Sequence, residues 1–231
     1  MGLNSYVARE PRALPIFILA DTSGSMRGEK INELNLSIRE MVNALKAMDD
    51  IRGKFQLCVI SFGGEVKVVQ PLADLGNLAL PELEEMGKTP MGQSFSIVKE
   101  MIEDREIVSS RAYAPTIVLV SDGIPTDCSE EMYKSKNYKD WSSLVSLHNG
   151  ERSGKSQRLA LGIGEDADTE MLKAFINNPE IPVIKANGAS GITTFFKWVT
   201  MSTVARMNSV NPNVVSTVAP TFDIDEEDII I

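Results

Sequence analysis

The chain has 231 residues, 43% of them hydrophobic and 24% charged, which is enough to bury the core of one α/β domain and too little for two full domains. Its formal net charge is −9 and it contains no block of Lys or Arg, so nucleic acid is not expected as a partner. Its 2 cysteines form no CxxC pair and no apolar run approaches the roughly 20 residues that cross a bilayer, so we expect a cytoplasmic protein without a disulfide framework, a thiolate zinc site or a membrane-inserted segment.

The first predicted strand is the apolar run IFILA at residues 16–20, which follows Pro15 and ends at Asp21. Its short length and branched side chains favour a central, buried strand over a helix. From Gly28 to Met48 apolar side chains recur at three- and four-residue steps, which predicts an amphipathic helix. In an open α/β sheet, ligands bind where the chain leaves the carboxyl end of a strand. The polar turn between this strand and this helix is therefore the first place to look for a site.

A hairpin is predicted next. Residues 55–62 and 66–69 are strand-like, and Gly63-Gly64 between them predicts a tight turn, so the two strands must be antiparallel. The acidic segment 74–88 is expected to be a loop with one helical turn. A helix is expected after Thr89-Pro90, because proline is well tolerated at a helix start.

The second fully buried strand is expected at residues 116–120, and it runs into Ser121-Asp122-Gly123 much as the first strand runs into Asp21. The remaining predicted elements are a helix at residues 141–149, a strand at 158–163, a short helix capped by Asp168, a strand at 181–184 and a helix at 190–207.

Six strands that alternate with helices predict an α/β fold: a mostly parallel sheet with one antiparallel edge strand and helices on both faces. We expect an N-terminal extension at residues 1–14, one domain at 15–208 and an acidic, disordered tail at 209–231, where the pattern dissolves into polar residues and a run of acids.

The turn after the first strand carries oxygen at alternate positions. Asp21, Ser23 and Ser25 can point their oxygens to one side, and hard cations such as Mg2+ take oxygen ligands. Hydroxyl ligands leave more residual charge on the ion than a cage of carboxylates, so the ion should attract one further anionic ligand. The sequence thus favours a metal site.

The motif Asp-x-Ser-x-Ser at residues 21–25, Thr89 ahead of a helix and Asp122 after the second buried strand together resemble the von Willebrand factor A (vWA) domain over residues 15–207. The resemblance implies a Rossmann-like three-layer fold and a metal-ion-dependent adhesion site (MIDAS). It implies that Ser23, Ser25 and Thr89 bind Mg2+ or Mn2+ directly, and that Asp21 and Asp122 bind it directly or through water. It also implies a protein partner that supplies an Asp or Glu carboxylate, and a binding module that is not an enzyme.

Within that family, the bare domain and the opening Arg12-Ala13-Leu14-Pro15 are similar to the cytoplasmic, bacterial TerY-like branch. This second resemblance implies a role in stress response or tellurium resistance.

The alternative is an enzyme that resembles Mg2+-dependent phosphatases of the haloacid dehalogenase type. Asp21 would be its nucleophile, with Asp122 and Asp127 after a later strand. Such enzymes need a second acid two residues after the nucleophile for proton transfer to the leaving group, and Ser23 occupies that position here. This substitution counts against the phosphatase.

Simpler interpretations exist for the same residues. Asp21 and the serines could form an ordinary helix-capping turn, and Thr89 precedes a proline, as in many loops. Asp127 is expected to be a solvated loop acid, and His148 a surface or helix-end residue. The agreement of three separated segments favours the metal site.

Overall fold

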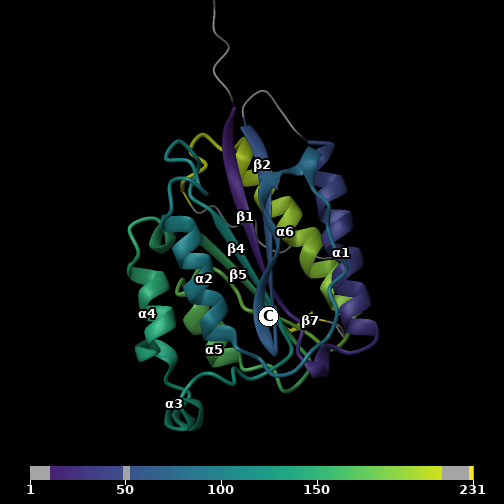
Figure 1. Cartoon of the computed structure of the whole chain (residues 1–231), viewed down its shortest axis with the longest axis vertical. Helices are drawn as coiled ribbons and strands as arrows, with labels where there is room; N and C mark the ends of the chain where they lie inside the picture. The colour runs from purple at the N-terminus through teal and green to yellow at the C-terminus, as the bar shows by residue number, and fades with distance from the viewer. Residues whose placement is uncertain (1–10, 49–52, 215–228, 231) are drawn as a thin grey trace, which may run out of the picture.

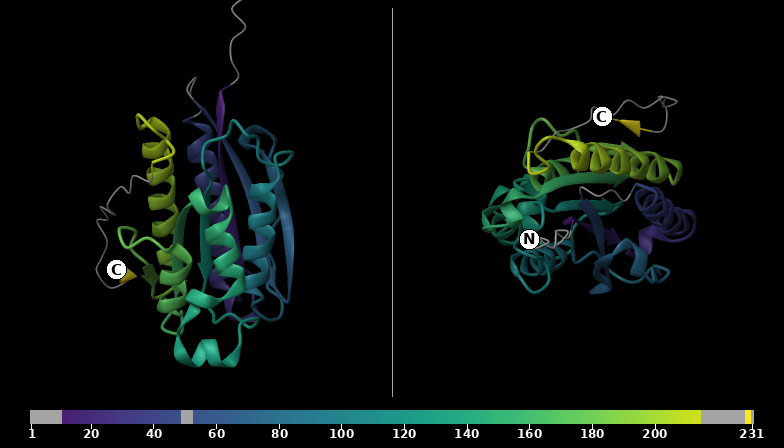
Figure 2. Two further views of the ribbon diagram at one scale, coloured as in Figure 1. Left: turned by 90° about the vertical axis from the view of Figure 1, so that its left-hand side faces the viewer. Right: turned by 90° about the horizontal axis from the view of Figure 1, so that it is seen from above.

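A computed structural model describes residues 11–48, 53–214 and 229–230 of the chain. One sheet lies between two layers of helices (Figures 1 and 2). The strands are β1 (Arg12–Asp21), β2 (Gly53–Gly63), β3 (Glu65–Asp74), β4 (Thr116–Ser121), β5 (Gln157–Ile163), β6 (Ile184–Ala186) and β7 (Ile229–Ile230). The helices are α1 (Glu29–Lys46), α2 (Met91–Glu103), α3 (Glu130–Ser135), α4 (Ser142–Asn149), α5 (Thr169–Ile176) and α6 (Ser190–Asn208), with short 3-10 turns η1 (Gly24–Met26), η2 (Leu75–Asn77), η3 (Tyr138–Asp140) and η4 (Ser153–Lys155).

The strand order across the sheet is β3-β2-β1-β4-β5-β6-β7. β1, β2, β4, β5 and β6 are parallel, and β3 pairs antiparallel with β2 through a turn at Gly64, whose φ of 69° favours glycine. The prediction of a six-stranded, mostly parallel sheet with one antiparallel edge strand is thus confirmed. β7 adds a short antiparallel pairing to β6. It comes from the segment predicted as a tail, of which residues 215–228 and 231 lie outside the described part of the chain.

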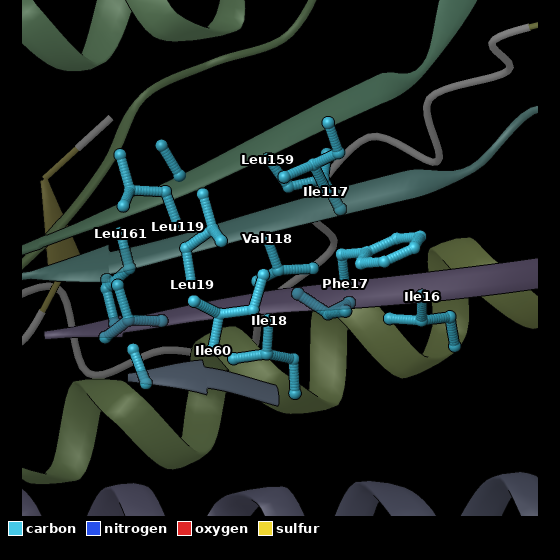
Figure 3. Packing of buried hydrophobic residues seen from close by; sticks show 14 of the residues in the cluster. Ile16, Phe17, Ile18, Leu19, Ile60, Ile117, Val118, Leu119, Leu159 and Leu161 are labelled. Atoms are coloured by element: carbon cyan, nitrogen blue, oxygen red, sulfur yellow. The ribbon is translucent and has the colours of Figure 1, made fainter. Parts of the chain in front are cut away.

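The core is built around β1, which pairs in parallel with β2 on one side and β4 on the other. All of its residues from Ala13 to Asp21 are buried. Figure 3 shows its apolar side chains packed against those of β2, β4 and β5. A strand covered on both faces must be apolar at every position, which explains why this segment reads as a continuous hydrophobic run.

The helices divide between the two faces of the sheet. α1 and α6 pack together on one face, and α2, α4 and α5 cover the other (Figures 1 and 2). Because each crossover returns the chain to the start of another parallel strand, the carboxyl ends of these strands meet at one edge of the sheet. Within the described part of the chain, no helix is both long and apolar enough to cross a membrane.

Two local predictions differ from the structure. The strand expected at residues 181–184 is β6 at 184–186, because Pro182 has no N–H for a ladder and the N–H of Ile181 instead bonds the Asn178 carbonyl in a turn at 3.2 Å. The polar segment before α4 contains α3, which buries no side chain and therefore shows no apolar periodicity. Ser129 caps α3 by accepting a hydrogen bond from the N–H of Met132.

Candidate metal centre

The first part of the candidate site is the exit from β1. Asp21 is the last residue of that strand and is fully buried. Its Oδ1 accepts a hydrogen bond from the N–H of Ser23 at 2.8 Å, and its Oδ2 accepts one from the hydroxyl of Ser121 at 2.5 Å. Ser121 ends β4, the strand beside β1, so the carboxylate is held from two neighbouring strands. Its orientation is fixed before any ligand arrives.

The second part joins the β1 exit to the β4 exit. The hydroxyls of Ser23 and Ser25 lie 3.1 Å apart, and the hydroxyl of Ser25 donates to Oδ1 of Asp122 at 2.7 Å. The predicted Asp-x-Ser-x-Ser motif and the aspartate after β4, separated by 97 residues between Ser25 and Asp122, therefore meet directly.

The third part is Thr89, immediately before α2. A Cβ placed on Gly123 would lie 3.4 Å from Oγ1 of Thr89 and 3.7 Å from Oδ2 of Asp21, so these two oxygens border the same small space, which glycine leaves open. The N–H of Thr89 donates to the hydroxyl of Thr126 at 3.2 Å, and the N–H of Thr126 donates back to the Thr89 carbonyl at 2.9 Å. The loop after β4 thus holds Thr89 at the sheet edge.

Burial and the neighbouring negative charge disfavour the ionised form of Asp21. Removal from water raises the pKa of Asp21 to about 6, the hydrogen bonds from Ser121 and Ser23 lower it, and the charge of Asp122 raises it further. The side chain of Asp122 is 1% exposed and pairs with Lys30, whose Nζ lies 2.5 Å from Oδ2. Of these two neighbouring buried carboxylates, only Asp122 pairs with an ammonium group in the described part of the chain, which leaves an excess of negative charge.

Comparison with known proteins bears on the fold that carries these residues. Residues 16–124 match the family model described as von Willebrand factor type A domain. This segment therefore resembles the vWA family in sequence. No curated protein is significantly similar to the chain in sequence.

Solved structures extend the vWA fold beyond that segment. The vWF domain of the type V pili tip protein Mfa5 from Porphyromonas gingivalis is 11% identical, with a TM-score of 0.64 over 87% of this chain and 97% of that one. A von Willebrand factor type A protein from Catenulispora acidiphila is 15% identical, with a TM-score of 0.62 over 83% of this chain and 42% of that one. Proximal thread matrix protein 1 from the mussel byssus, solved with a zinc-occupied MIDAS motif, is 18% identical, with a TM-score of 0.62 over 84% of this chain and 48% of that one. At these identities the likeness is one of fold, and the chain spans less than half the length of the latter two proteins.

The donor set of this site suits a hard divalent cation. Asp21, Ser23, Ser25, Thr89 and Asp122 supply only oxygen, and the three segments that carry them converge at one edge of the sheet. In the described part of the chain, no group of three or more His, Cys, Asp or Glu side chains is placed to hold a metal ion. A cation at this edge would therefore depend on hydroxyl ligands as well as on its two carboxylates.

Two residues that contact the predicted ligands, Ser121 and Lys30, were not predicted as part of the site. Ser121 could have been found from strand register. Ala20 lies opposite Val120, so the residues that follow them, Asp21 on β1 and Ser121 on β4, lie side by side. Lys30 gave no signal, because it lies among other polar residues at the start of an amphipathic helix.

Asp127 is an exposed acid in the loop after β4, as predicted, and it also has a structural role. Its two carboxylate oxygens accept the N–H groups of Gly92 at 3.1 Å and Gln93 at 2.8 Å, so it caps the first turn of α2. His148, at the end of α4, is partly buried and donates a ring N–H to the Phe175 carbonyl at 3.2 Å, a helix-end role as predicted.

Replacing Asp127 with alanine is expected to lower the free energy of unfolding by about 1 kcal/mol, because α2 loses its cap. Urea denaturation of the metal-free protein measures this, with Asp166→Ala as the control because Asp166 is an exposed acid. Equal losses in the two variants would show that the cap contributes nothing particular.

Proposed function

We propose that this vWA domain is a metal-dependent protein-binding module, in which a divalent cation at the β1 and β4 exits takes a carboxylate from a partner protein. The observation that carries the proposal is the convergence of three hydroxyls and only two carboxylates from separate segments on one small space. Ser23, Ser25 and Thr89 would hold the ion directly, and Asp21 and Asp122 directly or through water. Mg2+ and Mn2+ fit these ligands, and both prefer oxygen.

The charge of the site supports an anionic partner group. Without a cation, Asp21, Asp122 and Lys30 together carry one excess negative charge when both acids are ionised. A divalent ion adds two positive charges, so that the site no longer carries an excess of negative charge. An incoming Asp or Glu carboxylate is repelled in the first state and attracted in the second, which makes recognition dependent on the metal.

Two features argue against the phosphatase that the sequence left as an alternative. Ser23 stands where such an enzyme needs its second acid, and the side chain of Asp21, its nucleophile, is fully buried and accepts hydrogen bonds from Ser121 and Ser23. We therefore propose that the protein binds and does not catalyse. The test is hydrolysis of 4-nitrophenyl phosphate in the presence of Mg2+. Hydrolysis by the wild type that is lost in Asp21→Asn would contradict the proposal that the protein is not an enzyme.

The proposed setting is a cytoplasmic bacterial stress or tellurium-resistance system, which follows the similarity of the sequence to the TerY-like branch. Of the solved structures, the mussel byssus protein with its zinc-occupied MIDAS motif shows that the fold can hold a divalent ion. Expression of the chain with and without tellurite in a deletion background would test the setting separately from the metal chemistry.

Thr89→Ala is expected to weaken Mn2+ binding by roughly tenfold or more, because it removes one of the proposed direct ligands. Isothermal calorimetry measures this, with Thr200→Ala as the matched control, since the Thr200 hydroxyl bonds the Phe196 carbonyl within α6. Equal Mn2+ affinity in Thr89→Ala and wild type would remove Thr89 from the site.

In the wild type with Mn2+, added acetate is expected to lower the water-proton relaxation enhancement by displacing bound water.

A further inference from the structure

The side chain of Lys30 enters the candidate site from the helix that follows it. Lys30 is the second residue of α1, and its Nζ lies 2.5 Å from Oδ2 of Asp122 and 3.3 Å from the carbonyl oxygen of Ser25. The lysine side chain is 31% exposed, whereas that of Asp122 is 1% exposed. The ammonium group therefore covers the buried carboxylate from the solvent side.

This ion pair involves one of the groups that the cation needs. Asp122 offers Oδ1 to the hydroxyl of Ser25 and Oδ2 to Lys30, so both of its oxygens are engaged. In the described part of the chain no other Lys or Arg forms an ion pair with Asp122 or with Asp21. Lys30 is thus the cation that balances the charge of Asp122.

We propose that Lys30 is a built-in counter-cation that a divalent ion must displace from Asp122, and that it thereby sets the metal affinity of the site. The inference rests on the proposed function, because it concerns the same cation. An ammonium within contact distance of a ligand repels an incoming divalent charge, and the carboxylate must give up one partner to gain the other. Lysine suits such an exchange, because its flexible, partly exposed stem can carry the charge into solvent.

The ion pair between Lys30 and Asp122 also stabilises the metal-free fold. Without the ammonium, the buried carboxylate of Asp122 would face the neighbouring charge of Asp21 with only a hydroxyl as partner, a costly arrangement. With it, the site keeps its shape until a cation arrives. Metal binding then replaces the single positive charge of Lys30 beside Asp122 with the double positive charge of the ion.

The decisive experiment is calorimetric titration of Mn2+ into the wild type, Lys30→Met, Lys30→Arg and Lys46→Met. Lys30→Met is expected to bind Mn2+ roughly tenfold more tightly, because repulsion and competition are both removed. Lys30→Arg keeps the charge and should not bind more tightly. Lys46→Met, at the far end of the same helix, removes the same charge away from the site and should leave the affinity unchanged.

Thermal unfolding in EDTA provides an independent readout. Lys30→Met is expected to melt at a lower temperature than the wild type without metal and to gain more on addition of Mn2+. Should Lys30→Met not fold, Lys30→Gln keeps a hydrogen-bond donor for Asp122 without the charge.

Each outcome decides between the two proposals. If the wild type binds Mn2+ and Lys30→Met and Lys30→Gln bind it no more tightly, the role of Lys30 is overturned and the metal site stands. If no protein binds Mn2+, the metal site and the role of Lys30 fall together. Binding that appears only once the charge of Lys30 is removed would support both.

Discussion

Replacing Arg206 with alanine is expected to lower the free energy of unfolding by about 3 kcal/mol or more. The guanidinium lies fully buried near the end of α6 and donates to the carbonyl oxygens of Pro212 at 2.5 Å and Ala114 at 2.6 Å and to the hydroxyl of Thr116 at 2.8 Å. Alanine would leave these acceptors without a donor and open a cavity beneath α6. Urea denaturation monitored by circular dichroism measures the loss.

Two further variants separate the causes. Burial lowers the pKa of Arg206 to about 10, so the group stays charged at neutral pH. Across residues 11–48 and 53–214, no carboxylate forms an ion pair with it, and carbonyl oxygens carry the charge instead. Arg206→Met fills the volume without the hydrogen bonds, and Arg206→Lys keeps the charge without the planar fork. If Arg206→Met were as stable as the wild type, the hydrogen bonds would contribute nothing and the loss in alanine would be a packing effect.

The contribution of Asp21 is expected to make the metal-free protein more stable as the pH falls from about 7 to about 4. Burial raises the pKa of Asp21 from 3.8 to about 6 in the folded state. A group whose pKa is raised by folding stabilises the fold fully below its unfolded pKa, and this contribution is lost as the pH rises through the folded pKa. The shift corresponds to about 3 kcal/mol, which is lost between about pH 4 and about pH 6.

Asp21→Asn isolates this effect, because asparagine does not titrate: its Oδ1 can accept the N–H of Ser23, and its amide group can donate to the hydroxyl of Ser121. In EDTA the variant should be more stable than the wild type at neutral pH, by up to about 3 kcal/mol, and equal to it near about pH 4. Every other carboxylate titrates in both proteins, so the difference belongs to Asp21. If the free energies of unfolding of the two proteins changed with pH in the same way, ionisation of Asp21 would not destabilise the folded state.

Addition of Mn2+ should reverse the order. A cation beside Asp21 favours its ionised form, so saturating Mn2+ should stabilise the wild type at neutral pH and the asparagine variant much less. This sign change connects the burial of Asp21 to the proposed function: the acid destabilises the empty domain and holds the ion in the loaded one.

The fold and the placing of the predicted metal ligands could be predicted because both follow from periodicity. Continuous apolar runs such as residues 16–20 predict buried parallel strands, and such strands end at one edge of a sheet, so Asp21 and Asp122 were expected at the same edge; the pairing of β1 with β4 makes them neighbours. Thr89 was predicted as a ligand only from the resemblance to a known family, because a Thr-Pro sequence does not indicate at which edge of the sheet it will lie.

The rest depends on long side chains or on contacts between distant loops. The reach of Lys30 to Asp122 and the cap that Asp127 gives to α2 across 35 residues are set by tertiary packing, to which hydropathy is blind. Arg206 shows the same limit in the core: a charged residue in a helix reads as solvent-facing, yet carbonyl groups from two loops enclose it.

The central place of β1 also sets the order in which the protein can be completed during synthesis. β1 is translated first among the strands, but Asp21 receives its hydrogen bond from Ser121, 100 residues later. A nascent chain cannot assemble the cation site until the carboxyl end of β4 has left the ribosome. A bound ion should therefore stabilise only chains in which the carboxyl ends of both β1 and β4 are in place.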